Sequence, residues 1–207
     1  MSVKVKICGI TSAADAFAAA EAGADAIGLM FYEKSPRYVC VSEAAAIVRN
    51  LPPFVLKVGV FVDPPEDLVF QAITECGLNV VQFHGNESPE FCVQFGVMSI
   101  KAFRVRDADS LKQLADYPTD AWLLDAFSEK SIGGTGEQFN WDLALQAKQW
   151  GRLIFLAGGL TPKNVGDAVT RVQPFAVDVS SGVESAPGVK DHVKVREFIR
   201  AAKGEPA

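Results

Sequence analysis

The segment Lys6-Ile-Cys-Gly-Ile-Thr11 begins within an apolar alternation near the start of the chain, formed by Val3, Val5 and Ile7. The alternation over residues 3–7 predicts a short β-strand, because side chains of a strand point to opposite faces with a period of two. The glycine and the threonine predict the turn after the strand, and the alanine-rich run 13–22 predicts a helix. Cys8 is therefore expected at the carboxyl tip of the first strand, either as a small buried residue or as a reactive thiol.

The same strand–helix unit recurs along the chain. Expected strands cover 3–7, 26–31, 54–61, 79–83, 98–105, 121–125, 153–157 and 175–179. Expected helices cover 13–22, 42–48, 66–76, a segment from 88, a segment from 107 or 109 to 115, then 142–148, 161–169 and 189–203. Eight such units predict an α/β fold, a single-domain (β/α)8 TIM barrel over 1–207, with 204–207 as a frayed tail. A doubly wound open sheet is the alternative, although no Gly-x-Gly-x-x-Gly follows the first strand.

The composition excludes several classes of protein. The chain has 207 residues, of which 49% are hydrophobic and 22% charged, and its net charge is -5. No basic run suggests a nucleic-acid partner, and no apolar run reaches the roughly 18–20 residues of a membrane span. The start lacks a secretory segment, so a cytoplasmic location is expected. Four scattered cysteines and two histidines predict neither a disulfide framework nor a metal site.

Chemistry in such a barrel is expected at the carboxyl ends of the strands and in the loops that follow. Arg37 lies in the long second loop, where its planar fork suits a carboxylate, although an isolated loop arginine is usually only solvated. His84 either orients a ligand or caps its strand. The residues expected to contact a small-molecule substrate are Arg37, Gln82, His84 and Asp178.

Glycine and serine clusters after strands seven and eight predict a phosphate site. Glycines let backbone N–H groups approach an anion, and a helix N-terminus favours negative charge. These two loops are also the usual phosphate site of the barrel class. A third cluster, 133–136, is either a linker or a lid that adds donors. The expected phosphate-binding residues are Gly134, Gly136, Gly158, Gly159, Ser180, Ser181 and Gly182.

Cys8 and Asp125 form a candidate acid–base pair. Asp125 ends an apolar strand, and desolvation is expected to raise the pKa of its carboxyl group. Strands one and six stand well apart, so the two side chains can face each other across the barrel mouth. A substrate between them can lose a proton on one side and gain one on the other, which is the geometry of an isomerase. A free thiol has a pKa of about 8.5, so a site that uses Cys8 as a base must favour the thiolate.

Together these motifs resemble one family over essentially the whole chain, the phosphoribosylanthranilate isomerases of tryptophan biosynthesis. The matching segments are Lys6–Thr11, Phe31–Tyr38, Val58–Val62, Val81–Gly85, Leu123–Ala126, Gly133–Gly136, Ala157–Leu160, Asp178–Glu184 and Pro187–Asp191. The resemblance implies an Amadori rearrangement without a cofactor. It places the base on Cys8, the acid on Asp125, the anthranilate-carboxylate contact on Arg37, and the phosphate on the loops after strands seven and eight.

Two other functions remain open at this level. Another enzyme of the phosphate-binding barrels would keep the glycine loops but would not need Cys8 opposite Asp125. A non-catalytic phosphosugar-binding module would need only the phosphate site. The sequence also leaves open whether the chain is a monomer or a homodimer.

Overall fold

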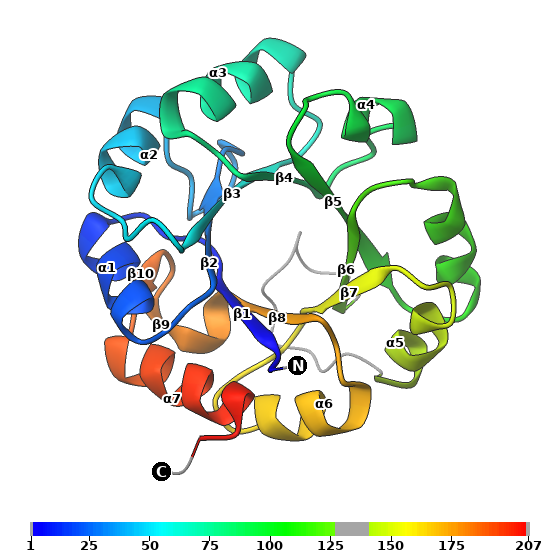
Figure 1. Cartoon of the computed structure of the whole chain (residues 1–207). Coiled ribbons are helices and arrows are strands. Elements are labelled where there is room, and N and C mark those ends of the chain that lie inside the picture. Colours follow the sequence, from blue (N-terminus) through cyan, green and yellow to red (C-terminus); the bar gives the residue numbers. More distant parts are fainter. Residues whose placement is uncertain (1, 127–140, 206–207) are drawn as a thin grey trace.

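The computed structural model describes residues 2–126 and 141–205. Eight parallel strands form a closed barrel in the order β1 to β8, with helices around it (Figure 1). This confirms the (β/α)8 barrel and excludes the open sheet. The strands are β1 Lys4–Ile7, β2 Ala26–Met30, β3 Leu56–Phe61, β4 Val80–Phe83, β5 Met98–Val105, β6 Ala121–Ala126, β7 Leu153–Leu156 and β8 Ala176–Val179. The helices are α1 Ala13–Glu21, α2 Val41–Val48, α3 Glu66–Cys76, α4 Pro89–Val93, α5 Trp141–Lys148, α6 Val165–Val172 and α7 His192–Lys203.

The alternation of β1 separates two buried environments. Val5 and Ile7 are fully buried and belong to the large apolar cluster between strands and helices. Lys6 and Cys8 point the other way and are also buried, at 1% and 6% exposure. In a closed barrel the face turned away from the helices is an interior, so the polar positions of this strand are not solvated.

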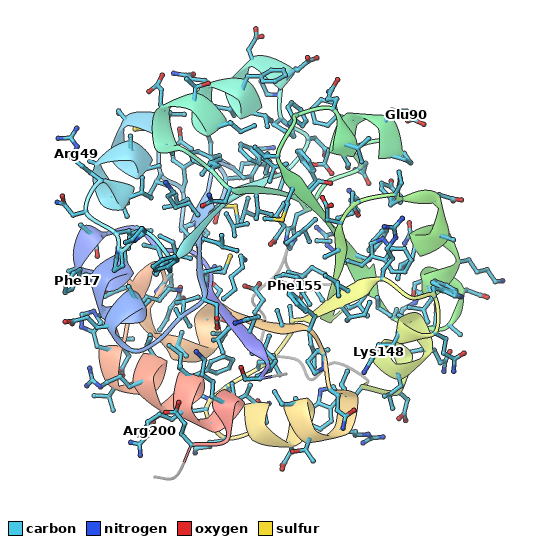
Figure 2. The ribbon with its side chains drawn as sticks, in the orientation of Figure 1. Phe17, Arg49, Glu90, Lys148, Phe155 and Arg200 are labelled. Atoms are coloured by element: carbon cyan, nitrogen blue, oxygen red, sulfur yellow. The ribbon has the colours of Figure 1, made fainter. Side chains whose placement is uncertain are left out.

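The barrel interior holds a separate, smaller cluster of mostly small aliphatic side chains. Phe155 of β7 packs against it and points toward the barrel axis in Figure 2. Small residues suit this space because eight converging strands leave room for only a few side chains in each layer. The buried members are Cys8, Ala26, Val58, Val60, Val80, Ile100, Ala102, Ala121, Leu123 and Ala157.

The helix ends show why these segments become helices. The Ser12 and Ser88 hydroxyls accept hydrogen bonds from the N–H groups of Asp15 and Phe91, which caps α1 and α4. Gly77 ends α3 in the left-handed conformation, with φ of 58°, as its position after the helical pattern predicts. None of the described helices is long and apolar enough to cross a membrane.

Two expected α-helical segments differ from the prediction. Residues Asp109–Asp116 form a 3-10 helix, η1, because Asp107 and Ser110 bond to each other's backbone N–H groups and so favour a tight turn. The helix that was expected to start at residue 161 is α6, and it begins at Val165 instead. The Asn164 side chain accepts from the Thr161 N–H (2.7 Å) and donates to the Gly159 carbonyl (3.0 Å), which holds the preceding residues in a turn.

The segment before the last helix was also predicted wrongly. After the short 3-10 helix η2, Ser181–Val183, strands β9 Glu184–Ala186 and β10 Val189–Lys190 pair as an antiparallel hairpin. The expected helix from residue 189 therefore begins only at His192, where the Asp191 carboxylate caps it. Lys190 is 4% exposed; its backbone N–H donates to the Asp15 carboxylate and its Nζ donates to the Glu184 carboxylate. These contacts hold Lys190 in the buried hairpin, so it cannot be part of an exposed first helical turn.

Candidate active site

A cavity of about 510 Å³ opens at the carboxyl ends of the strands. It brings together residues that the sequence placed at separate strand ends. The side chains in its lining that the sequence predicted as functional are Cys8, Arg37, His84, Asp125, Asp178 and Ser180. A larger groove of about 620 Å³, which includes Cys40 and Leu68, contains none of them. The smaller cavity is therefore the candidate active site.

Cys8 stands at the tip of β1, held by a 2.8 Å hydrogen bond from its N–H to the Val179 carbonyl. Its thiol packs against the bare backbone of Gly28 on β2: a β-carbon built on Gly28 would lie 2.7 Å from Cys8 Sγ and 3.2 Å from Lys6 Cε. The thiol and the end of the Lys6 side chain thus flank the same point on the neighbouring strand.

Lys6 forms a buried ion pair with Asp178, with 2.7 Å between Lys6 Nζ and Asp178 Oδ1. The pair follows from register, since the two residues are partners on adjacent strands β1 and β8. Burial raises the pKa of the Cys8 thiol, and the Lys6 ammonium group only partly opposes this effect. The expectation that the site favours the thiolate is therefore wrong for the free protein.

Asp125, the last residue but one of β6, lines a different wall of the same cavity and is 9% exposed. Strand β6 pairs with β5 and β7, whereas β1 pairs with β2 and β8, so the two strands are well separated around the barrel. Asp125 and Cys8 therefore approach the cavity from two sides, as the sequence predicted.

Gln82 and His84 act as a unit at the end of β4. Gln82 is fully buried beneath the cavity, and its Nε2 hydrogen-bonds to Nε2 of His84, which lines the cavity. Burial, together with Lys6, Lys101 and Arg104, lowers the pKa of His84 to about 3. His84 is thus a neutral imidazole at physiological pH. Gln82 does not line the cavity, and we interpret it as the residue that orients His84.

Arg37 has a carboxylate partner within the chain. Its Nε and Nη2 donate to the two carboxylate oxygens of Glu184, at 2.8 and 2.7 Å. Glu184 also accepts from Lys190 Nζ at 2.7 Å. Sequence reasoning missed Lys6, Glu184 and Lys190. Only Lys6 carried a signal, because it occupies an inward position of a barrel strand.

The two glycine loops are adjacent, as expected of a shared site. Gly158 and Gly159 have φ of 81° and 68°, the left-handed region that glycine adopts without strain. Gly182 packs so closely on the Leu160 carbonyl that any β-carbon would overlap it. The loops after β7 and β8 are thus in contact.

The structure brings only some of the expected phosphate-binding residues to the cavity. Ser180 lines it, and its Oγ is near Gly9 with no hydrogen-bond partner among the described residues. Gly158, Gly159, Ser181 and Gly182 are not in the lining of this cavity. Gly134 and Gly136 lie outside the described residues. Within residues 2–126 and 141–205, no three His, Cys, Asp or Glu side chains gather as metal ligands.

The fold and this cavity define an enzyme of the (β/α)8-barrel class, with its polar groups at the strand ends. A family model described as N-(5'phosphoribosyl)anthranilate (PRA) isomerase matches residues 5–201. The chain therefore belongs to the phosphoribosylanthranilate isomerase family.

Curated relatives and solved structures agree with this assignment. Relatives named N-(5'-phosphoribosyl)anthranilate isomerase include one from Geobacter sulfurreducens, 57% identical over 98% of this chain and 99% of that protein. Another from Citrifermentans bemidjiense is 58% identical over 97% of each. The crystal structure of phosphoribosyl anthranilate isomerase from Thermotoga maritima has a TM-score of 0.92, with 43% identity over 98% of this chain and 99% of that one.

A further crystal structure shows a phosphoribosyl anthranilate isomerase in complex with reduced 1-(o-carboxyphenylamino)-1-deoxyribulose 5-phosphate. It has a TM-score of 0.89 and 42% identity, over 98% of this chain and 99% of that one. By contrast, 3-hexulose-6-phosphate synthase from Salmonella typhimurium shares the fold, with a TM-score of 0.71 at 15% identity.

Proposed function

We propose that the chain isomerises N-(5'-phosphoribosyl)anthranilate to 1-(2-carboxyphenylamino)-1-deoxyribulose 5-phosphate, an Amadori rearrangement in tryptophan biosynthesis. The observation that carries the proposal is one cavity lined by Cys8, Asp125 and Arg37 together. A sugar-phosphate enzyme with a different substrate has no need for a guanidinium at this place, whereas the aromatic carboxylate of this substrate does.

The reaction divides into two proton transfers. Asp125, as the acid, protonates the furanose ring oxygen; the C1–O bond then breaks, and the nitrogen lone pair forms the C1=N iminium. Cys8, as the base, removes the proton from C2, and the C–H electron pair forms the C1=C2 bond while the iminium nitrogen becomes neutral. The resulting enolamine tautomerises to the ketone: the C2 hydroxyl loses its proton as C2=O forms, and the C1=C2 electron pair takes up a proton at C1. A general acid and a general base each contribute about 100- to 10,000-fold in rate.

The buried thiol requires help to ionise, and two cations supply it. Lys6 lies beside the thiol and is itself held by Asp178. The iminium formed in the first step brings a second positive charge next to the sulfur, which lowers the energy of the thiolate when the base is needed. Cys8 is therefore a base that becomes effective after ring opening, and no covalent intermediate is required.

Substrate positioning supplies the remaining catalysis. Arg37 binds the carboxylate at one end of the substrate, and the loops after β7 and β8 bind the phosphate at the other. His84, as a neutral imidazole, offers a hydrogen bond to the sugar between them, and Asp178 acts mainly through Lys6. No step needs a cofactor or a metal.

The test is a pair of substitutions, Cys8→Ser and Asp125→Asn, assayed by the loss of anthranilate fluorescence. Each should lower kcat by at least about 100-fold with a modest change in KM, because each removes one proton-transfer partner. Matched controls are Cys40→Ser, at a half-exposed thiol outside the cavity, and Asp109→Asn, at an 84% exposed carboxylate. Near-normal turnover in either active-site variant would remove the role assigned to that residue.

The alternatives predict other outcomes. A different sugar-phosphate isomerase would turn over substrates that lack the aromatic carboxylate, which a substrate panel detects. A binding module would bind the substrate without converting it.

Three further features complete the proposal. The chain is one domain and works in the cytoplasm, which is supported by four free cysteines.

The chain is a monomer or a homodimer. A related crystal structure, 40% identical, is of monomers generated from the dimeric isomerase of Thermotoga maritima. The present chain exposes apolar side chains at the amino end of the barrel, among them Phe54 at 93% and Leu153 at 47%. Sedimentation of the wild type and of Phe54→Ser would distinguish the two states.

A further inference from the structure

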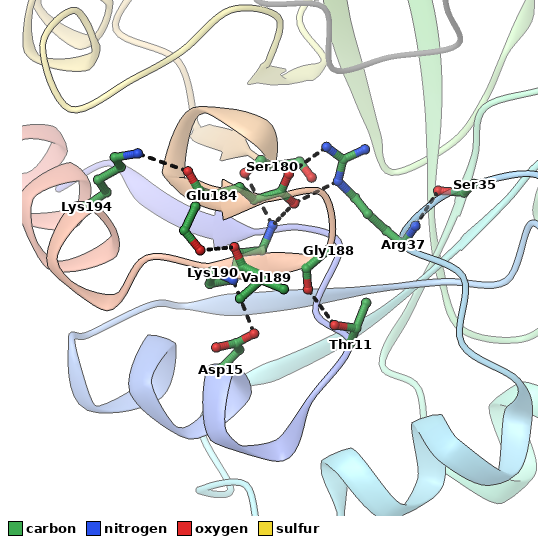
Figure 3. A network of polar contacts seen from close by, with 11 residues as sticks. Thr11, Asp15, Ser35, Arg37, Ser180, Glu184, Gly188, Val189, Lys190 and Lys194 are labelled. Carbon is green, nitrogen blue, oxygen red and sulfur yellow. Dashed lines mark hydrogen bonds and ion pairs between the residues drawn. The ribbon is translucent and has the colours of Figure 1, made fainter.

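Arg37, Glu184 and Lys190 form a three-residue ion network beside the cavity (Figure 3). Both oxygens of Glu184 bind Arg37, and Oε1 also accepts from Lys190. The network is almost dry: the side chains of Arg37, Glu184 and Lys190 are 15%, 5% and 0% exposed. Interactions within such a site are little screened by water, so its geometry is tightly held.

The network carries a net positive charge. Burial acts against ionisation of Glu184, but the hydrogen bonds from Arg37 and Lys190 outweigh it and hold the pKa of Glu184 below its usual range. One carboxylate thus stands between two cations. An Arg37–Glu184 pair alone would be neutral and would attract an anion weakly, so Lys190 is the residue that leaves a positive charge available for the substrate.

Among the described residues, the hydrogen bonds of the Arg37 side chain leave one edge of its guanidinium for a ligand. Of its five N–H donors, Glu184 uses the one on Nε and one on Nη2. The edge formed by Nη1 and the second hydrogen of Nη2 is the edge that can bind another carboxylate in bidentate fashion. Gly9 makes room for this arrangement, since a β-carbon there would overlap Arg37 Cδ.

The β9–β10 hairpin anchors the network from outside the barrel. Lys190 Nζ donates to the Ser180 carbonyl (3.2 Å), Lys194 Nζ donates to the Glu184 carbonyl (2.9 Å), and the Thr11 hydroxyl donates to the Gly188 carbonyl. The hairpin backbone therefore fixes Glu184, which can orient Arg37, a residue of the loop after β2.

We propose that Glu184 is a positioning residue that aims the free edge of Arg37 at the carboxylate of the substrate, while Lys190 keeps the pair net cationic. The inference rests on the proposed function, because it uses the aromatic carboxylate of that substrate. It also assigns a role to the β9–β10 hairpin, which supplies both the orienting carboxylate of Glu184 and the ammonium group of Lys190.

Charge and positioning predict opposite results at Glu184. If Glu184 acted only through its charge, Glu184→Gln would make the site more positive and lower KM. If Glu184 orients Arg37, the same change breaks the two-point contact and raises KM by about 10- to 100-fold with little change in kcat, since one charged hydrogen-bonded partner is lost. Glu197→Gln on α7 is the matched control, because it removes the same charge at an exposed position.

A double variant guards against misfolding. Glu184→Gln alone leaves Lys190 buried without its carboxylate, which is costly to the fold. Glu184→Gln combined with Lys190→Met removes both charges, so the net charge of the network equals that of the wild type. Positioning predicts a raised KM in this variant too, whereas a pure charge effect predicts the wild-type KM. Circular dichroism establishes that each variant is folded.

The decisive comparison uses a second ligand, the analogue in which aniline replaces anthranilate, measured by its competition with the substrate. The penalty of the single and double variants should appear with the substrate and vanish with the analogue, which has no carboxylate. An equal penalty with both ligands, or none with the substrate, would overturn the inference alone. Absence of turnover by the wild type would refute the proposed function and this inference with it.

Discussion

Gly28→Ala should displace the Cys8 thiol, the proposed base, without removing any polar group. Gly28 lies on β2 beside the tip of β1, and its β-carbon would stand 2.7 Å from Cys8 Sγ, 3.1 Å from Cys8 Cα and 3.2 Å from Lys6 Cε. Two of these neighbours are side-chain atoms, so they are the atoms that must move. The Cα atom moves less readily, because the Cys8 backbone N–H is hydrogen-bonded to the Val179 carbonyl of β8.

The size of the effect follows from the overlap. Comfortable contacts between such atoms are about 3.5–4.0 Å, so the sulfur must shift by about 1 Å. A misplacement of that size costs about 100-fold in rate when the displaced group takes part in the reaction. Inserting a methyl group into a packed interior costs about 1–3 kcal/mol, which corresponds to a fall in Tm of roughly 2–12 °C in a chain of this length.

The assay is steady-state turnover beside thermal unfolding, with Gly166→Ala as the control. Gly166 lies on α6, and among the described residues a β-carbon there would meet only the Ala201 carbonyl of α7, at 3.5 Å, which is an ordinary contact. Gly166→Ala should therefore keep the wild-type kcat and leave Tm unchanged or raise it slightly, since alanine favours helices by up to about 1 kcal/mol. Wild-type kcat in folded Gly28→Ala would refute the idea that the thiol position limits proton removal.

Three further predictions concern other parts of the molecule. Because burial raises the pKa of the Cys8 thiol above its ordinary value of 9.0, its thiolate should form in the free protein only in alkaline solution, and the thiolate absorbance that is lost in Cys8→Ser should appear above about pH 9; its appearance below about pH 8 would contradict this. Lys101 Nζ lies 2.6 Å from the carboxylate of Glu87, a residue that is 6% exposed, so Lys101→Met leaves this carboxylate without its cation. The substitution should lower the free energy of unfolding by about 3–5 kcal/mol in urea titrations. A loss under about 1 kcal/mol would show that Glu87 is stabilised by other groups. Gly182→Ala pushes the loops after β7 and β8 apart at Leu160 and should raise KM by about tenfold or more through weaker phosphate binding, and an unchanged KM would exclude these loops as the phosphate site.

Several parts of the site were predictable because they depend on local pattern. The periodicity of each segment places its last residue at a strand end, and the barrel class places strand ends at the active site. Cys8, His84 and Asp125 were found in this way, and all three line the cavity. Gln82 was only partly anticipated, because the sequence does not distinguish a residue that lines a cavity from one that orients its neighbour from below.

Other features depend on partners that no local pattern reveals. Lys6 shares the inward face of the first strand with Cys8, but its ion pair with Asp178 forms only when the barrel closes and β1 pairs with β8. The β9–β10 hairpin resembles a helix start in sequence, and its actual form follows from the burial of Lys190 against Glu184. The η1 segment was assigned to the wrong helix type because side-chain hydrogen bonds at Asp107 and Ser110 compete with the helical ones.

The sequence by itself determined the eight strand–helix units, the barrel they form and the strand ends where chemistry is placed, because burial of alternate or every third or fourth side chain is a local property of the chain. Only the tertiary structure decided the charge partners. Lys6 meets Asp178 across 172 positions of sequence, and Arg37 meets Glu184 across 147. The first contact arises when β1 pairs with β8, and the second when the β9–β10 hairpin meets the loop after β2; they affect the ionisation of the thiol and the direction of the guanidinium.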